Sequence, residues 1–368
     1  MRAMSGDKGC SRAVDFQNKI SYNEVIVNVK GNIMATLKDI AKEAGVSAMT
    51  VSRVMNGNSR AVSEQTARKV RRIAEELGYV PNSSARALVS HSSRLIAALL
   101  TEEEQGRSPL SDGYNGFFFG ELARQIQRQG YDLMLHYIKD YQEINYSLKS
   151  WNVAGAVFIG LFDDNIREIK EHHHIPLIFT DSYSSVRRIA NVGIDDFHGG
   201  ELAAEHFLAK GHQKVAFVGP QAVGNGLVMQ RLQGFAAKLK QAGAELMQRH
   251  IFCQDGQKME EILQILMNEP DPVTGIFATS DSCAVEILGA AYRLEYKIPE
   301  ELSVIGFDDL PISSQTVPPL TTIRQDIVRK AEITCQLLMK HIQDLESPME
   351  NVVLDVELKE RGSVSERG

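Results

Sequence analysis

The fold of the amino-terminal part follows from residues 37–57, LKDIAKEAGVSAMTVSRVMNG. Apolar residues recur there at helical spacing, and Gly45 can take the positive φ that ends a first helix. Ser47 is a good N-cap for a second helix, and a third helical pattern begins at Ser63 and closes at Gly78. Three short helices with a tight Gly-Val-Ser turn between the first two predict a helix-turn-helix, the motif whose second helix enters the major groove of DNA.

The second helix carries side chains that point away from its apolar stripe and suit DNA. Arg53 can offer a bidentate fork to guanine, and Ala48 and Met49 can contact thymine methyl groups. Thr50 and Ser52 can reach phosphates. Any compact three-helix domain shows similar periodicity, so the pattern alone leaves a purely structural interpretation open.

Charge is shared unevenly along the 368 residues. The formal net charge is -7, yet residues 34–94 hold ten Lys and Arg against five Asp and Glu, and the remainder is strongly acidic. A small basic module on an acidic body suggests that only the module meets a polyanion. The alternative is that these lysines and arginines form an ordinary solvated helical surface.

Several protein classes are excluded by composition. No apolar run approaches the roughly 18 residues of a membrane span. Residues 1–33 lack the apolar segment of a secretory signal, and we interpret them as a poorly ordered leader or the product of a misassigned start, with Met34 as the natural start. The four cysteines lie far apart, which argues against zinc spacing or a disulfide framework and favours reduced thiols in a cytoplasmic protein.

The run 37–57 continues into residues 77–89, LGYVPNSSARALV, and together they resemble the headpiece and hinge segment of the LacI/GalR family of bacterial transcription regulators. The hinge, residues 81–93, is too short for a stable isolated helix and is expected to fold on DNA. In the family a leucine matching Leu88 wedges into the minor groove, although Leu88 can also be read as a core leucine. The resemblance and the helix pattern together imply DNA contacts by Thr36, Ser47, Ala48, Met49, Thr50, Ser52, Arg53, Asn56, Tyr79, Asn82, Ala85, Arg86 and Leu88.

The acidic body, residues 94–362, shows short apolar runs that alternate with helical patterns. Six runs stand out, beginning at residues 95, 155, 176, 214, 275 and 302. This alternation predicts α/β lobes with parallel, doubly wound sheets. The region resembles the two-lobed periplasmic-binding-protein-like core of the same family.

Polar residues follow these runs at the carboxyl ends of the predicted strands, where ligands bind in such sheets. Carboxylates, a guanidinium and aromatic rings suit a polyhydroxylated ligand such as a sugar. The predicted effector-binding residues are Tyr114, Phe118, Asp181, Arg231, Asp281 and Asp308. The family resemblance implies the same role for Arg231, Asp308 and Asp181, whereas an Asp at a strand end can also simply cap the next helix.

The resemblance also implies the domain boundaries. The headpiece is expected at 34–80, lobe one at about 94–193 and 323–351, lobe two at about 194–322 and 352–362, and a tail at 363–368. The segment 101–112 departs from the family's usual short loop, which puts the effector's fit there in doubt. No apolar heptads follow residue 360, so a tetramerisation helix is not expected and a homodimer is.

These observations predict a cytoplasmic, nucleoid-associated repressor of carbohydrate genes. It would bind a palindromic operator as a homodimer under control of a small molecule in the interlobe cleft. A second hypothesis is a sugar-sensing regulator controlled mainly by a phosphocarrier protein. An enzyme would need a phosphate loop or paired catalytic acids, which the sequence does not show; no cofactor and no metal is expected, and His172, His173 and His174 are interpreted as a solvated helix end.

Overall fold

The chain forms two compact units, a headpiece within residues 1–86 and a core within 87–368. The structure is a computed structural model, and it describes residues 35–55, 62–79, 93–101, 108–138, 141–160, 163–184, 186, 189–222, 224–253 and 256–367. The leader 1–33 and nearly all of the hinge lie outside the described residues, and so do Asn56, Asn82, Ala85, Arg86 and Leu88. The expectations for these residues therefore stay predictions.

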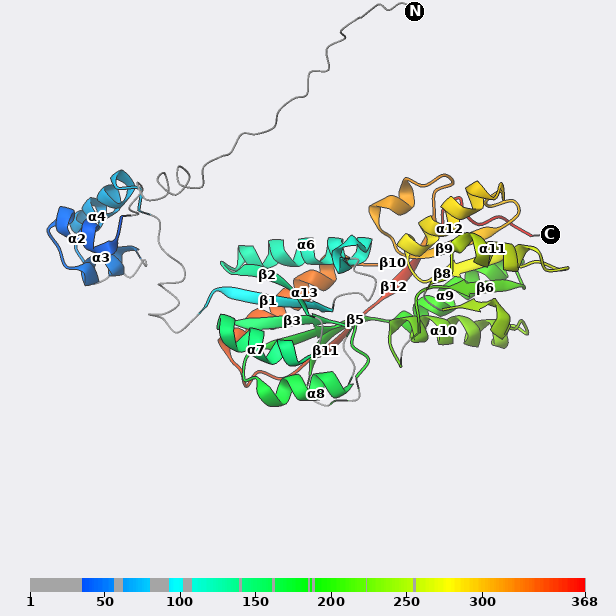
Figure 1. The fold of residues 1–368 in the computed structure, drawn as a ribbon, viewed down its shortest axis with the longest axis horizontal. Coiled ribbons are helices and arrows are strands. Elements are labelled where there is room, and N and C mark those ends of the chain that lie inside the picture. The colour runs from blue at the N-terminus through cyan, green and yellow to red at the C-terminus, as the bar shows by residue number, and fades with distance from the viewer. Residues whose placement is uncertain are drawn as a thin grey trace, which may run out of the picture. The chain divides into compact units, whose positions relative to one another are not determined.

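The headpiece consists of three helices: α2 (Leu37–Ala44), α3 (Ala48–Met55) and α4 (Glu64–Glu76) (Figure 1). Gly45 ends α2 with φ at 68°, and Ser63 caps α4 by accepting a hydrogen bond from the Thr66 amide at 3.2 Å. Buried Ile40, Val51 and Val70 bring the three helices around one small core. The predicted helix-turn-helix is confirmed, because a left-handed glycine and a serine cap turn the chain between apolar stripes.

Lobe one of the core is built on six parallel strands in the order β11-β5-β4-β3-β1-β2. Helices α6 and α13 pack together on one face of this sheet, and α7 and α8 cover the other (Figure 1). The strands are β1 (Leu95–Thr101), β2 (Asp132–Ile138), β3 (Gly155–Ile159), β4 (Leu177–Thr180), β5 (Ala190–Ile194) and β11 (Asn351–Leu354). The helices are α6 (Gly113–Arg128), α7 (Tyr141–Trp151), α8 (Asp163–His172) and α13 (Ile327–Gln343).

Lobe two repeats this plan with the sheet order β12-β10-β9-β8-β6-β7, in which only the β10–β12 pair is antiparallel. Helices α9 and α10 pack on one face, and α11 and α12 pack on the other. The strands are β6 (Val215–Val218), β7 (Ile251–Phe252), β8 (Gly275–Ala278), β9 (Ser303–Asp308), β10 (Thr321–Gln325) and β12 (Val356–Lys359). The helices are α9 (Asp196–Ala209), α10 (Leu227–Gln241), α11 (Met259–Met267) and α12 (Asp281–Arg293).

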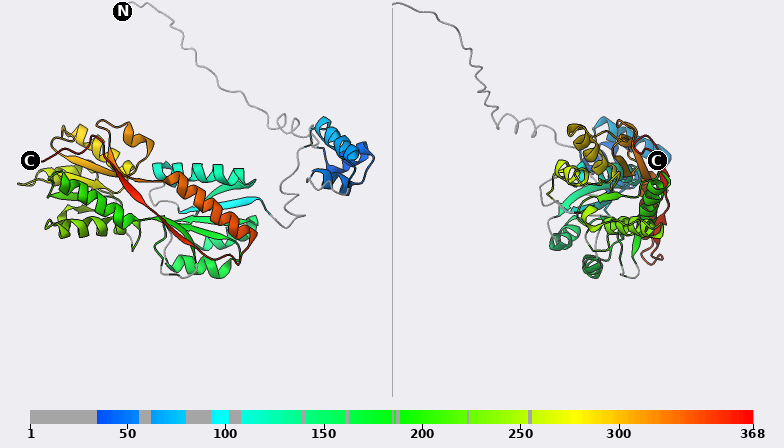
Figure 2. Two further views of the ribbon diagram at one scale, coloured as in Figure 1. Left: turned by 180° about the vertical axis from the view of Figure 1, so that it is seen from behind. Right: turned by 90° about the vertical axis from the view of Figure 1, so that its right-hand side faces the viewer.

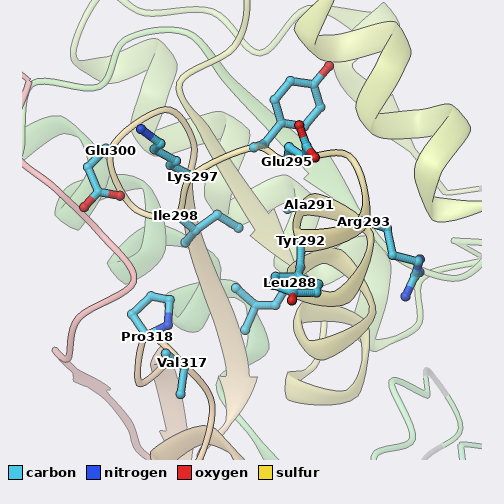
Figure 3. Close-up of a pocket in the computed structure, with 11 residues that line it drawn as sticks. Leu288, Ala291, Tyr292, Arg293, Glu295, Lys297, Ile298, Glu300, Val317 and Pro318 are labelled. Atoms are coloured by element: carbon cyan, nitrogen blue, oxygen red, sulfur yellow. The ribbon is translucent and has the colours of Figure 1, made fainter.

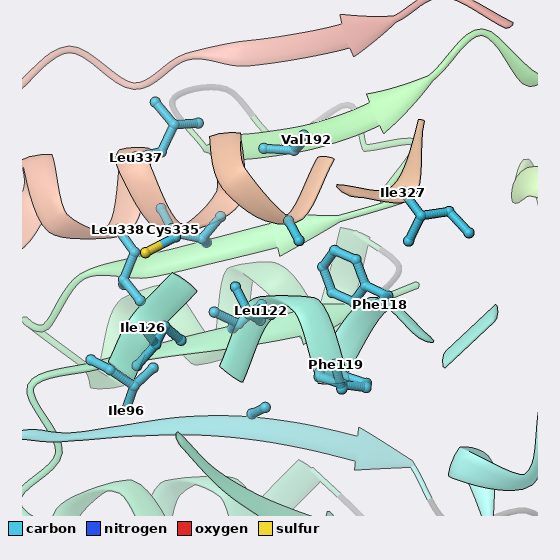
Figure 4. Packing of buried hydrophobic residues seen from close by; sticks show 14 of the residues in the cluster. Ile96, Phe118, Phe119, Leu122, Ile126, Val192, Ile327, Cys335, Leu337 and Leu338 are labelled. Carbon is cyan, nitrogen blue, oxygen red and sulfur yellow. The ribbon is translucent and has the colours of Figure 1, made fainter. Parts of the chain in front are cut away.

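The six apolar runs of the sequence are all strands, and each is buried between two helical layers. In lobe one, Phe118, Leu122 and Ile126 of α6 face Cys335 and Leu338 of α13 above the sheet (Figure 4). Burial of these side chains from both sides explains why the runs are apolar throughout rather than alternating.

The chain passes between the lobes three times, at Asp195, Asp326 and Asp355 (Figure 2). The passages expected near Ile323 and Val352 lie three residues further along the chain. Ile323 lies inside β10 of lobe two and Val352 inside β11 of lobe one, because each strand completes its pairing before the chain leaves the sheet.

Residues 363–367, which belong to the predicted tail, are hydrogen-bonded to lobe two. Ser363 is fully buried, and its Oγ donates to the Val304 carbonyl at 2.6 Å and accepts from the Thr321 amide at 2.8 Å. The Arg367 amide donates to the Lys210 carbonyl at 2.8 Å. These bonds tie residues 363–367 to the lobe.

The contact between α9 and α10 leaves no room for a side chain at Gly234. A Cβ there would lie 1.9 Å from the Phe197 carbonyl oxygen, and the backbone would have to move. Gly234→Ala is therefore expected to lower the free energy of unfolding by about 1–3 kcal/mol, the range for overpacking. Urea unfolding of the full chain measures this.

Gly120 provides the matched control. It lies inside α6, and no heavy atom would come within 4 Å of an added Cβ. Gly120→Ala should be neutral or stabilising by up to about 1 kcal/mol, because alanine is the better helix former. Equal destabilisation by both substitutions would contradict the packing argument.

Candidate functional site

The headpiece presents the second helix of its helix-turn-helix as predicted. Val51 and Val54 are buried against the other helices, whereas Ala48, Met49 and Arg53 are exposed. Met49 is an apolar side chain left 65% exposed. The helix therefore offers an apolar contact and a guanidinium on one solvent-facing side.

The hydroxyl residues predicted to touch DNA also cap the two helices. Thr36 and Asp39 form a reciprocal capping box at the start of α2. The Ser47 Oγ accepts from the Thr50 amide at 3.1 Å at the start of α3. Helix amino termini favour anions, so both starts are suited to phosphate. Tyr79 is half-buried and packs against the headpiece core.

In the core, the carboxyl end of β4 meets the start of α13. Asp181 follows β4 and pairs with Lys330 Nζ of α13, with both side chains almost fully buried. The Tyr114 hydroxyl donates to Asp181 Oδ2 at 2.8 Å and accepts from Lys330 Nζ at 2.7 Å. Burial, followed by the nearby Asp181 charge, raises the pKa of Tyr114 well above its usual value. This closed triad belongs to lobe one.

A second charged pair forms in lobe two. Arg231 Nε, on α10, donates to Asp196 Oδ1 at 2.7 Å, and the Arg231 guanidinium lies 3.5 Å above the centre of the Phe307 ring. Tyr183 of lobe one donates its hydroxyl hydrogen to Asp196 and so links the two lobes. Burial raises the pKa of Asp196, and the Arg231 charge partly offsets the rise.

Asp308 ends β9 between these two pairs. Its backbone has φ at 113°, and Gln325 Nε2 of β10 donates to its Oδ1 at 2.7 Å. Gln325 Oε1 in turn lies 3.5 Å from Lys330 Nζ, so a chain of polar contacts runs from one lobe to the other. Burial is the main reason that the pKa of Asp308 is raised well above its usual value.

Two predicted effector residues, Asp281 and Phe118, are fully buried and engaged by other parts of the protein. Asp281 is fully buried and both its oxygens are engaged: Oδ1 accepts from Thr322 Oγ1 at 2.6 Å, and Oδ2 accepts from the Leu310 amide at 2.7 Å. Phe118 is fully buried in the lobe-one core under the Tyr114 ring, with 6.1 Å between ring centres. Asp281 therefore holds β10 and Leu310 to α12, and Phe118 positions Tyr114.

The sequence reasoning missed Asp196, Lys330, Gln325 and Tyr183. Lys330 and Asp196 lie in helices, where a charged residue is normally solvated, and their partners are distant in sequence. A usable signal existed for Gln325, because it ends a strand next to the Asp308 strand. His173 is a further correction, because it is buried and bonds to Asn145 Oδ1 at 2.7 Å rather than facing solvent.

The described surface also has hollows away from this network. A pocket of about 620 Å³ on lobe two lies between the end of α12 and the loop at Val317 (Figure 3). None of the predicted effector residues lines it. Another, of about 700 Å³, is lined by Asp181 and Tyr183 together with Asn191 and Asn225. The second opening therefore reaches the residues that link the lobes.

Comparison with known proteins agrees with this architecture. Residues 36–82 match the description "Bacterial regulatory proteins, lacI family", and residues 204–364 match "Periplasmic binding protein-like domain". The "Probable HTH-type transcriptional repressor ExuR" of Bacillus subtilis (strain 168) is 30% identical over 341 residues, which cover 90% of this chain and 98% of that protein. The chain belongs to the lacI family of bacterial regulatory proteins.

Other relatives of this lacI-family regulator are repressors too. The "Ribose operon repressor" of Escherichia coli (strain K12) is 29% identical over 343 residues, 90% of this chain and 100% of that protein. A solved lac repressor dimer, bound to operator and the anti-inducer ONPF, has the same fold, with a TM-score of 0.79 and 24% identity over 90% of this chain and 99% of that one.

A solved LacI family transcriptional regulator from Enterococcus faecium, with bound ribose, has a TM-score of 0.65 and is 26% identical. The match covers 74% of this chain and 100% of the Enterococcus faecium chain. The family membership makes the protein a transcriptional regulator rather than an enzyme. No helix in the described parts of the chain is long and apolar enough to cross a membrane.

Proposed function

We propose that this lacI-family regulator represses its target genes as a homodimer on a palindromic operator, and that a small polar molecule between the two lobes controls it. The exposed face of α3 with Arg53 and Met49 supports sequence readout in the major groove. In a bacterium such a protein acts in the cytoplasm, at the nucleoid.

The convergence of Arg231, Asp308 and Asp181 is the observation that carries the ligand site. Arg231 uses two of its N–H groups on Asp196 and the Thr279 carbonyl, and a guanidinium has five. The remaining donors and the Asp308 carboxyl can bond neighbouring hydroxyls of a polyhydroxylated ring. Two observations on relatives support a carbohydrate ligand. The Enterococcus faecium relative was solved with bound ribose, and another relative is named a ribose operon repressor.

Control follows from the links between the lobes. Tyr183 to Asp196 and Lys330 to Gln325 are bonds across the cleft, and a ligand that replaces or reinforces them favours one lobe arrangement over another. Rotation of the lobe next to the DNA would separate paired hinges and weaken operator binding. The names of the relatives give no support to control by a phosphocarrier protein.

Asp308→Ala tests the ligand site. The variant should bind genomic fragments selected by the wild-type protein with unchanged affinity, but lose the response to carbohydrates that alter wild-type binding. The substitution leaves buried hydroxyls of the ligand without their partner on Asp308, which predicts ligand affinity about 10-fold to 100-fold weaker. Calorimetry and DNA binding with a panel of pentoses and hexoses measure both effects.

Asp271→Ala is the matched control, because Asp271 lies on the surface of lobe two with its side chain 90% exposed. It should respond like the wild type. A fully responsive Asp308→Ala protein would overturn the assignment of the cleft.

A further inference from the structure

The buried groups of the cleft carry more acid than base. Four carboxylates, Asp181, Asp196, Asp281 and Asp308, lie with two cations, Arg231 and Lys330, and all six side chains are almost fully buried. Water screens little at such depth, so each charge requires a specific partner. Asp281 accepts hydrogen bonds from Thr322 and from the Leu310 amide on its two oxygens, so three carboxylates remain for two cations, and one of the three has no cation.

The pairing identifies Asp308 as the unmatched group. Arg231 is paired with Asp196 and Lys330 with Asp181. Asp308 accepts a hydrogen bond from the neutral amide of Gln325, and within the described part of the chain no lysine, arginine or histidine forms an ion pair with it.

The groups around Asp308 reinforce this shortage of positive charge. Arg231 of α10 attracts the carboxylate, but Asp281 of α12 and Asp112 at the start of α6 repel it. The charge of Asp308 also contributes to the raised pKa of Tyr114 on α6. Burial is the main reason that the pKa of Asp308 is raised, and the repulsion by Asp281 and Asp112 acts in the same direction.

We propose that the ligand of this cleft carries a protonated amino group and that Asp308 is its counter-ion. The inference rests on the proposed function and narrows its ligand class to an amino derivative of a polyhydroxylated compound. The ammonium group replaces the proton on Asp308, which leaves to solvent, and all three carboxylates then face a cation. A neutral sugar leaves Asp308 protonated, whereas a carboxylate or phosphate adds a second excess negative charge.

The expected order of affinity is amino sugar, then neutral sugar, then acidic sugar. Sugars that share one carbon skeleton test this order. Calorimetry with the full-length protein would compare D-glucosamine, D-galactosamine and D-mannosamine with their neutral parents, and with D-glucuronate and D-galacturonate. At least one amino sugar is expected to bind 10-fold or more tightly than its parent, and the uronates more weakly than either. Titration in two buffers of different ionisation enthalpy should show proton release with the amino sugar, at a pH where its amine is charged.

Asp308→Asn should remove both the amino preference and the proton release, because the amide cannot titrate. Asp271→Asn, on the exposed surface, should keep both. The wild-type measurements stand even if Asp308→Asn does not fold.

Different results would overturn the proposed function and the charge inference. If neutral or acidic sugars bind as tightly as all of the amino sugars, the charge inference is overturned. The ligand site of the proposed function would still stand. Tight amino-sugar binding without proton release would also overturn the role of Asp308. If no sugar of the panel binds, the carbohydrate ligand of the proposed function fails and this inference falls with it.

Discussion

Arg231→Met is expected to abolish the response to the cleft ligand and to lower the free energy of unfolding by about 3–5 kcal/mol, the range for breaking a buried ion pair. Methionine keeps an apolar chain against Phe307 but leaves Asp196, 1% exposed, without its cation. The Thr279 carbonyl also loses its guanidinium donor. Urea unfolding and ligand calorimetry measure the two effects.

The pH dependence gives a second signature of the same variant. Burial already raises the pKa of Asp196, and removal of the Arg231 charge would raise it further. A carboxyl whose pKa is higher in the folded than in the unfolded protein stabilises the fold when protonated, so stability falls as the pH rises between the two values. The destabilisation by Arg231→Met should accordingly be smaller at pH 5 than at pH 8.

Arg293→Met is the matched arginine control. Its side chain is 59% exposed and pairs with Glu260 on the surface, where an ion pair contributes about 0–1 kcal/mol. Arg231→Met with Asp196→Asn should recover part of the lost stability, because the unpaired charge is gone. A single Arg231→Met variant as stable as Arg293→Met would contradict the buried pair.

Arg53→Ala is expected to remove operator discrimination. A bidentate contact to a base contributes about 1–3 kcal/mol of discrimination, and a dimer loses it in both half-sites. Binding to unrelated DNA depends on phosphate contacts and should change little. Titrations with a selected genomic fragment and a scrambled fragment of equal length, at fixed salt, measure the ratio.

Arg68→Ala is the control that separates the loss of a base contact from the loss of a positive charge on the headpiece. Arg68 lies on α4 and pairs with Glu64, so its loss should affect the two fragments equally. An equal loss of affinity on both fragments by Arg53→Ala would assign Arg53 to the phosphate backbone instead.

Much of the architecture could be predicted because local signals and tertiary packing agree. The six buried strands read as continuous apolar runs, and the turn at Gly45 and Ser47 carries its own backbone chemistry. The edge strand β2 was not predicted, since it mixes exposed and half-buried residues, and β11 and β12 are short and sit at the sheet edges. Such strands are defined by their neighbours more than by their own sequence.

The candidate site divides in the same way. Asp181 and Asp308 could be found because Asp181 directly follows a buried strand and Asp308 ends one. Lys330 could not, because its partner Asp181 is 149 residues away and nothing in a helix sequence distinguishes a buried lysine from a solvated one. Asp281 had the right position, yet its oxygens are consumed by Thr322 and Leu310, which only the folded chain reveals.

Each of the three passages between lobes lies at an aspartate, and two of these, Asp195 and Asp326, also cap the helices that follow. At these two passages the cap fixes the chain on one side, and Asp355 is the single residue between β11 and β12, so bending is confined to very few bonds. Because three chain passages join the lobes, the lobes cannot separate. Cleavage of the chain at any one passage would leave the other two intact. Three short tethers still permit a change in the angle between the lobes. Ligand binding in the cleft would have to reach the DNA as such a change of angle.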